Sequence, residues 1–219
     1  MMAGNEITIP VTPVELGGEL NLPSNAIGLV LFAHGSGSSR HSPRNQYVAR
    51  IIREARVGTL LFDLLTREEE AEDLMTRHLR FDIGLLAERL VDATRWVAEQ
   101  DDTRHLRVGY FGSSTGGGAA LVAAAAMGEA IGAVVSRGGR PDLAGSALSR
   151  VVSPTLLIVG GRDEVVLRLN QEAYAQLQCK KALKIIAGAT HLFEEPGALE
   201  EVARLAAEWF REHLQPRDG

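Results

Sequence analysis

Short runs of apolar residues along this chain alternate with longer segments in which apolar residues recur every three or four positions. Runs of the first kind predict buried strands, and segments of the second kind predict amphipathic helices. Strands that alternate with helices are typical of a mostly parallel sheet with helices on both of its faces. The pattern therefore predicts an α/β fold with a sheet of about 7–8 strands.

The individual elements follow from this pattern and from local signals. The predicted parallel strands are residues 28–33, 59–63, 108–111, 131–135, 155–159 and 183–186, and the predicted helices are residues 42–56, 81–100, 115–127, 166–178 and 198–213. Near the start of the chain, residues 7–11 and 19–22 flank Gly17-Gly18 and predict an antiparallel hairpin at the edge of the sheet. Residues 66–80 are highly charged and predict a solvated loop or a short surface helix.

Composition indicates one soluble domain over residues 1–219. No internal repeat, low-complexity linker or shift in composition marks a second domain. The chain is 45% hydrophobic and 23% charged, which excludes disorder. Its formal net charge of −5 lacks the basic footprint of a nucleic-acid-binding protein, so no nucleic-acid partner is expected.

Three features predict a cytoplasmic protein with no membrane partner. No apolar run reaches the length that spans a membrane. Residues 1–6 show no basic region followed by an apolar core, so no signal peptide is expected there. The single cysteine, Cys179, cannot form an internal disulfide and fits a reducing compartment. The sequence leaves a homo-oligomer open.

The segment Gly112-Ser-Ser-Thr-Gly116 carries the strongest chemical signal. It lies between a predicted buried strand and an alanine-rich helix, which is the sequence form of a nucleophile elbow. Glycines two positions before and after Ser114 allow a sharp turn, and the following helix directs unpaired N–H groups towards developing negative charge. Ser114 is therefore the candidate nucleophile, with a helix-capping serine as the alternative. Ser113 is expected to face the interior.

Two candidate partners of this serine follow later strands. A serine hydroxyl needs a base to take its proton, and the base works best when a third group orients it. Asp163 follows the strand at 155–159 and His191 follows the strand at 183–186. Because parallel strands all open at one edge of the sheet, Ser114, Asp163 and His191 can converge there. Two alternatives remain: Asp163 caps the next helix while Asp142 serves as the acid, and His191 is an ordinary loop histidine.

An oxyanion hole is expected beside the serine. One backbone N–H comes from Thr115, the residue after the nucleophile, and another comes from the glycine-containing loop at residues 32–39. In that loop Ser36 is the preferred donor, and Gly37 is the alternative. His34 is expected to hold the loop in place by hydrogen bonds.

Four arginines lie on loops at the same predicted edge: Arg40, Arg44, Arg137 and Arg140. Guanidinium groups bind carboxylate and phosphate well, so these arginines are candidate substrate-binding residues for an anionic substrate. The alternative is that they pair with nearby carboxylates of the protein itself. No histidine pair has metal-ligand spacing, and the motifs of phosphate-binding and dinucleotide-binding loops are incomplete, so neither a metal nor a cofactor is expected.

Taken together, these motifs resemble the α/β-hydrolases of the dienelactone-hydrolase-like group, over nearly the whole chain. The resemblance rests on His34-Gly35, the elbow around Ser114, Gly161-Arg-Asp163 and Ala189-Thr-His191, in family order. It implies an α/β-hydrolase fold and acyl-enzyme chemistry. The best-known members have cysteine at the elbow, whereas Ser114 favours a serine esterase-type mechanism. The loop after residues 131–135 is short, so no large lid domain is expected.

The expected function is hydrolysis of a small carboxylic ester or lactone, with an anionic group on the substrate as a further expectation. A thioesterase, a peptidase or an acyltransferase would use the same serine, histidine and aspartate. A non-catalytic ligand-binding protein with the same pocket also stays open.

Overall fold

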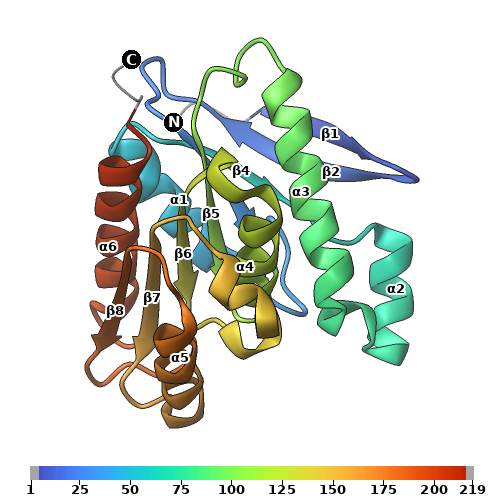
Figure 1. The fold of residues 1–219 in the computed structure, drawn as a ribbon. Helices are drawn as coiled ribbons and strands as arrows, with labels where there is room; N and C mark the ends of the chain where they lie inside the picture. The colour runs from blue at the N-terminus through green and yellow to red at the C-terminus, as the bar shows by residue number, and fades with distance from the viewer. Residues whose placement is uncertain (1–4, 216–219) are drawn as a thin grey trace.

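The computed structural model describes residues 5–215 and contains an eight-stranded sheet with helices on both faces (Figure 1). The strands are β1 Asn5–Val11, β2 Val14–Asn21, β3 Leu29–Ala33, β4 Gly58–Phe62, β5 Val108–Ser113, β6 Ile131–Arg137, β7 Thr155–Gly160 and β8 Lys181–Ile186. Their order across the sheet is β1-β2-β4-β3-β5-β6-β7-β8. The hairpin β1–β2 joins the sheet antiparallel, and the six other strands are parallel. The predicted α/β architecture is confirmed.

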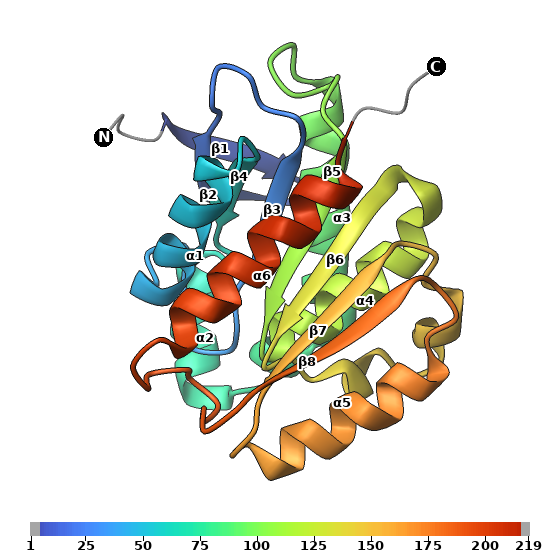
Figure 2. The same ribbon diagram turned by 90° about the vertical axis from the view of Figure 1, so that its left-hand side faces the viewer.

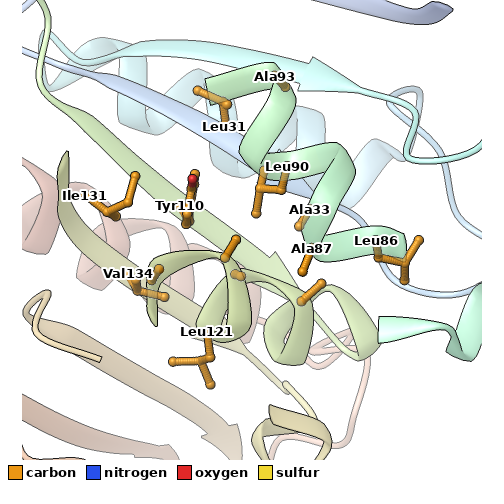
Figure 3. Packing of buried hydrophobic residues seen from close by; sticks show 14 of the residues in the cluster. Leu31, Ala33, Leu86, Ala87, Leu90, Ala93, Tyr110, Leu121, Ile131 and Val134 are labelled. Carbon is orange, nitrogen blue, oxygen red and sulfur yellow. The ribbon is translucent and has the colours of Figure 1, made fainter. Parts of the chain in front are cut away.

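Helices cover the two faces of the sheet as separate layers. The helices α1 Pro43–Glu54 and α6 Ala198–His213 lie on one face, towards the viewer in Figure 2, while α3 Ile83–Glu99 and α4 Thr115–Met127 lie on the other. On the second face, Leu90 and Leu121 pack with strand residues such as Tyr110 in a buried apolar cluster (Figure 3). The helix α5 Glu164–Gln176 adds buried Ala173 to the same cluster. No helix within residues 5–215 combines the length and the apolar character that crossing a membrane requires.

Capping residues fix where the helices begin. Ser42 accepts a hydrogen bond from the Asn45 N–H at the start of α1, and a proline occupies the first turn. The charged segment after β4 forms the helix α2 Arg67–Thr76, which Thr66 and Glu69 start with a reciprocal capping box. Of the two predictions for this segment, the surface helix is confirmed.

The turn of the N-terminal hairpin lies at Thr12-Pro13, so its prediction at Gly17-Gly18 was wrong. Both glycines lie inside β2, where Gly17 pairs with Thr8 and Gly18 with Ile7. A Cβ on Gly18 would lie 3.2 Å from Ile7 Cγ1, and one on Gly17 would lie 3.1 Å from a guanidinium nitrogen of Arg40. These glycines let side chains approach the strand closely, a role that the sequence pattern does not distinguish from a turn.

The order of the strands reverses at β3. From β3 the chain passes to β4 on one side, and it then returns to β5 on the other side of β3. Ligands of open α/β sheets bind outside the carboxyl ends of the strands at such a reversal. The loop after β3 and the turn after β5 flank this point, and they carry His34 and Ser114.

The expectation about a signal peptide concerned residues 1–6, of which residues 1–4 lie outside the described part of the chain.

Candidate active site

Ser114 occupies a strained turn between β5 and α4. Its φ of 52° and ψ of −122° are disfavoured for any residue with a side chain, and such a conformation costs about 1–3 kcal/mol. The turn is tight on both sides: a Cβ on Gly112 would lie 2.4 Å from the Gly116 oxygen, and one on Gly116 would lie 2.1 Å from the Ala33 oxygen. Ser114 is half-buried, whereas Ser113 is 2% exposed. The local geometry is therefore that of a nucleophile elbow.

Backbone hydrogen bonds hold the elbow against the end of β6. The Ser114 N–H donates to the Arg137 carbonyl at 3.3 Å. The Ser114 carbonyl accepts from the Gly117 N–H at 3.0 Å and from the Arg140 N–H at 2.9 Å. The position of the serine is thus fixed by both its own helix and the loop that follows the neighbouring strand.

The structure brings His191 and Asp163 together. The His191 Nδ1 and Asp163 Oδ2 atoms are 2.6 Å apart, although 28 residues separate the two in sequence. Asp163 precedes α5 but its side chain makes no capping hydrogen bond, and Asp142 binds Arg140. Of the two acids considered from the sequence, Asp163 is the one that contacts the histidine.

One loop links this pair to Ser114. A Cβ on Gly138 would lie 3.6 Å from His191 Cε1, and Gly138 directly follows Arg137, whose carbonyl holds the Ser114 N–H. Within residues 5–215, the Ser114 hydroxyl makes no hydrogen bond to His191. Contacts of this kind are often long without substrate and tighten when substrate binds. Ser114, His191 and Asp163 therefore lie around one loop at one edge of the sheet.

The loop that carries His191 is held by Glu195, a residue that the sequence analysis missed. Glu195 Oε1 accepts from the Thr190 hydroxyl at 2.6 Å and from the Thr190 N–H at 3.1 Å. The hydrogen bond from the Thr190 hydroxyl is the main cause that lowers the pKa of Glu195. A carboxylate four residues after the candidate base, just before Pro196-Gly197, was the available sequence signal.

In the expected oxyanion hole, the two predicted donors belong to residues that contact each other. The Ser36 N–H donates to the Thr115 hydroxyl oxygen at 3.0 Å, a contact between residues 79 positions apart. Gly37, the alternative donor, follows with a φ of 69°. The preferred donor is therefore already engaged with a side chain at the start of α4.

His34 holds this loop by hydrogen bonds, as expected. Its Nε2 accepts from the Leu64 N–H at 3.0 Å, so its Nδ1 carries the proton and donates to the Gly35 carbonyl at 3.0 Å. Burial lowers the pKa of His34 by more than the Gly35 hydrogen bond and the charge of Asp63 raise it. The imidazole is therefore neutral at neutral pH and ties the end of β3 to the chain after β4.

This lowered pKa predicts a pH-dependent stability. Below the unfolded-state pKa of about 6.5, the unfolded chain binds a proton at His34 that the folded chain does not, so stability falls as the pH falls. Denaturant unfolding of the wild type and His34→Gln at pH 7.5 and pH 5.5 should show a smaller pH-dependent loss in the variant. Exposed His105, changed to Gln, is the control. An equal pH dependence in His34→Gln and wild type would contradict the assignment.

Three of the four candidate arginines, Arg40, Arg44 and Arg140, pair with carboxylates of the protein. Arg40 pairs with Asp63 and Glu6, beside the β1–β2 hairpin. Arg140 binds both oxygens of Asp142, at 2.8 and 2.7 Å. The alternative that the arginines pair with carboxylates of the protein itself therefore describes Arg40 and Arg140.

Arg137 differs from the other three because it is buried without a carboxylate partner. Its side chain lies at the end of β6 and is 8% exposed, and neither Nε nor Nη1 has a hydrogen-bond partner in the described residues. Burial, and then the charge of Arg44, lower the pKa of Arg137 to about 10, so it remains a cation at neutral pH. The Phe193 ring lies under it, 6.0 Å from the guanidinium carbon. Arg44 itself pairs with exposed Glu194 at 3.1 Å, and its own Nε is also unpartnered.

A cavity of about 510 Å³ adjoins the oxyanion loop. Ser36, Gly37, Arg44 and Thr115 line it, and its far wall comes from α2 and the segment after it. The sequence did not indicate that wall, whose lining residues include Glu70, Asp73, Leu74 and Arg80. The available signal was position, because a segment that follows the carboxyl end of a parallel strand lies on the ligand-binding edge.

A buried ion pair fixes this wall. Asp73 is 3% exposed and accepts from both the backbone N–H and the guanidinium of Arg80. Burial would raise the pKa of Asp73, but the hydrogen bonds and the charge of Arg80 outweigh it and hold that pKa below its ordinary value. In residues 5–215, no three His, Cys, Asp or Glu side chains are grouped so as to hold a metal ion.

The fold is that of an α/β-hydrolase. The chain belongs to the dienelactone hydrolase family, whose sequence model matches residues 53–215. It is similar to the crystal structure of a dienelactone hydrolase from Anabaena variabilis, with 62% identity, a TM-score of 0.95, and coverage of 97% of this chain and 98% of that one. Est1E from Butyrivibrio proteoclasticus shares the fold at 17% identity, with a TM-score of 0.80 over 96% of this chain and 99% of that one.

The chain is also similar to a curated protein of Mycobacterium tuberculosis named "Putative phosphoribosyl transferase". The two are 60% identical over 209 residues, which cover 95% of this chain and 46% of that protein. The chain thus spans about half the length of this relative.

Proposed function

We propose that this protein hydrolyses a small carboxylic ester or lactone through an acyl-enzyme on Ser114. Membership of the dienelactone hydrolase family supports a hydrolase, and the ester bond and residue roles are our proposal. The observation that carries it is the 2.6 Å contact between His191 and Asp163 beside the strained Ser114 elbow. The single cysteine supports a reducing, cytoplasmic compartment for this reaction.

The chemistry has two halves. His191 takes the proton of the Ser114 hydroxyl as its oxygen attacks the carbonyl carbon, and Asp163 stabilises the imidazolium. The carbonyl π electrons move onto oxygen, which accepts a hydrogen bond from the Thr115 N–H at the start of α4. His191 then gives the proton to the leaving alcohol. Water, deprotonated by the same histidine, releases the acid and restores Ser114.

An anionic group on the substrate is part of the proposal. Arg137 is a buried cation without a carboxylate partner, and nearby Arg44 pairs with exposed Glu194 while its own Nε stays unpartnered. Both carboxylate and phosphate oxygens would satisfy the unpartnered Nε and Nη1 of Arg137. The mycobacterial relative is named for transfer of a phosphoribosyl group, which carries a phosphate, and this favours testing phosphorylated esters beside carboxylated ones.

Other acyl chemistries use the same serine. A thioesterase, a peptidase and an acyltransferase differ only in the leaving group or the acceptor, and a ligand-binding protein would bind without forming an acyl-enzyme. A panel of matched ester, thioester and amide substrates separates the first three, with and without an added acceptor alcohol. Tight binding without turnover would favour the last.

A small fluorophosphonate tests the proposal directly. Intact mass of the treated wild type should show one adduct, and peptide mass analysis should place it on Ser114. Ser114→Ala is the matched variant and should show none. Folded wild type that forms no adduct would overturn the serine mechanism and leave the ligand-binding alternative.

A further inference from the structure

Thr115 presents two hydrogen-bond donors at the start of α4. It is the first residue of that helix and is 2% exposed. Its backbone N–H lies in the first turn, where no helical carbonyl can accept from it. Its hydroxyl oxygen accepts from the Ser36 N–H at 3.0 Å, and the hydroxyl hydrogen has no acceptor among residues 5–215. Both hydrogens of Thr115 are thus available next to Ser114.

The contact between Ser36 and Thr115 decides which group can donate a hydrogen bond to a substrate oxygen. A hydroxyl accepts through a lone pair and donates its one hydrogen at the same time. The Ser36 N–H is already engaged, and turning it towards a substrate would leave the buried Thr115 oxygen without its donor, which is unfavourable. If the hydroxyl donates instead, every existing hydrogen bond is kept.

We propose that the Thr115 hydroxyl is itself a catalytic donor to the oxyanion, with the Ser36 N–H acting through it as a positioning group. This inference rests on the proposed ester hydrolysis at Ser114. When Ser114 attacks the carbonyl carbon, the π electrons move to the carbonyl oxygen. That oxygen accepts hydrogen bonds from the Thr115 N–H and the Thr115 O–H, and no proton is transferred to it.

Two physical features favour this arrangement. Hydrogen bonds in a chain polarise one another, so a hydroxyl that accepts from the Ser36 N–H is a stronger donor to a developing anion. Threonine is also β-branched, which restricts rotation about χ1 and holds the hydroxyl in place. The oxyanion hole is then built mainly on the rigid start of α4 rather than on the exposed loop at Ser36 and Gly37.

The test removes only the hydroxyl. Thr115→Val keeps the branched shape without the O–H group, and Thr115→Ser keeps the O–H group without the methyl. We expect Thr115→Val to lower kcat by about 10²-fold with KM changed little, as for loss of one oxyanion donor. Thr115→Ser should restore most of the activity. Ser149→Ala, which removes an exposed hydroxyl outside this cavity, is the control. If Thr115→Val does not fold, Thr115→Ala replaces it.

The affinity for a transition-state analogue distinguishes a catalytic role of the hydroxyl from a structural one. A purely structural role would not weaken the analogue selectively. Ser114 attacks the carbonyl carbon of a trifluoromethyl ketone, and the adduct carries an oxyanion. The matching product carboxylate binds without forming one. Thr115→Val should weaken the ketone in proportion to the loss of kcat and leave product binding unchanged. Equal weakening of both ligands would overturn the proposal.

The remaining outcomes separate this inference from the proposed function. A Ser114 adduct in both proteins, with kcat unchanged in Thr115→Val, would overturn the role of the hydroxyl while ester hydrolysis stands. A raised kcat would also overturn it, because the hydroxyl would then be blocking the Ser36 N–H. Failure of wild type to form the adduct would overturn both.

Discussion

Ser114→Ala is expected to lower kcat for ester hydrolysis by about 10⁵- to 10⁶-fold, as loss of the nucleophile does in other serine hydrolases. The backbone should be unaffected, because alanine keeps the Cβ that already sits at a φ of 52°. Ser114→Ala should still hydrolyse the ester about 10³- to 10⁴-fold faster than the uncatalysed reaction in water, because substrate binding and the oxyanion donors remain. Steady-state kinetics on a short-chain ester, with thermal unfolding of each protein, is the measurement.

Ser113→Ala is the matched control for this prediction. Ser113 precedes Ser114 and carries the same hydroxyl, but it is 2% exposed and faces the interior. Its removal should leave kcat within a few-fold of wild type. A large loss in Ser113→Ala together with near-normal activity in Ser114→Ala would show that the elbow presents the other hydroxyl.

Arg137→Met is expected to stabilise the protein and at the same time to reduce its activity on anionic substrates. A buried charge without a partner is costly, and even buried ion pairs replaced by apolar side chains of similar volume often gain about 1–4 kcal/mol of stability. The contact with the Phe193 ring offsets part of this gain. Urea unfolding should therefore show a higher midpoint, while kcat/KM for a carboxylated or phosphorylated ester falls by about 10²-fold, the value of a lost charged hydrogen bond. A neutral ester of the same alcohol should change little.

Arg140→Met separates an anion-binding role from a general effect of lost charge. Arg140 lies on the same loop, but its guanidinium already binds Asp142. Its removal should neither raise stability nor change the preference between anionic and neutral esters. Equal losses on both ester types in Arg137→Met would contradict substrate binding, and a lower unfolding midpoint would contradict the view that the buried charge is unsatisfied.

Much of the fold was predictable because its signals are local. Apolar runs placed all six parallel strands, and the N-cap at Ser42 with Pro43 after it placed the start of α1. The elbow was predictable for the same reason: the need for glycine at Gly112 and Gly116 arises within a few residues of the turn itself. The hairpin is the exception, because a glycine pair marks either a turn or a close approach, and the residues that approach lie elsewhere in the chain.

The sequence by itself thus determined the α/β architecture, the elbow at Ser114 and the short list of candidate partners. Tertiary structure alone decided that Asp163 rather than Asp142 meets His191, that Arg137 rather than Arg40 stays without a carboxylate, and that Ser36 contacts Thr115. Each of these outcomes depends on atoms of residues far apart in sequence, such as the 79 positions between Ser36 and Thr115. Hydrogen bonds and ion pairs act over a few ångströms, so the folded path of the chain, and not the spacing along it, selects the partners.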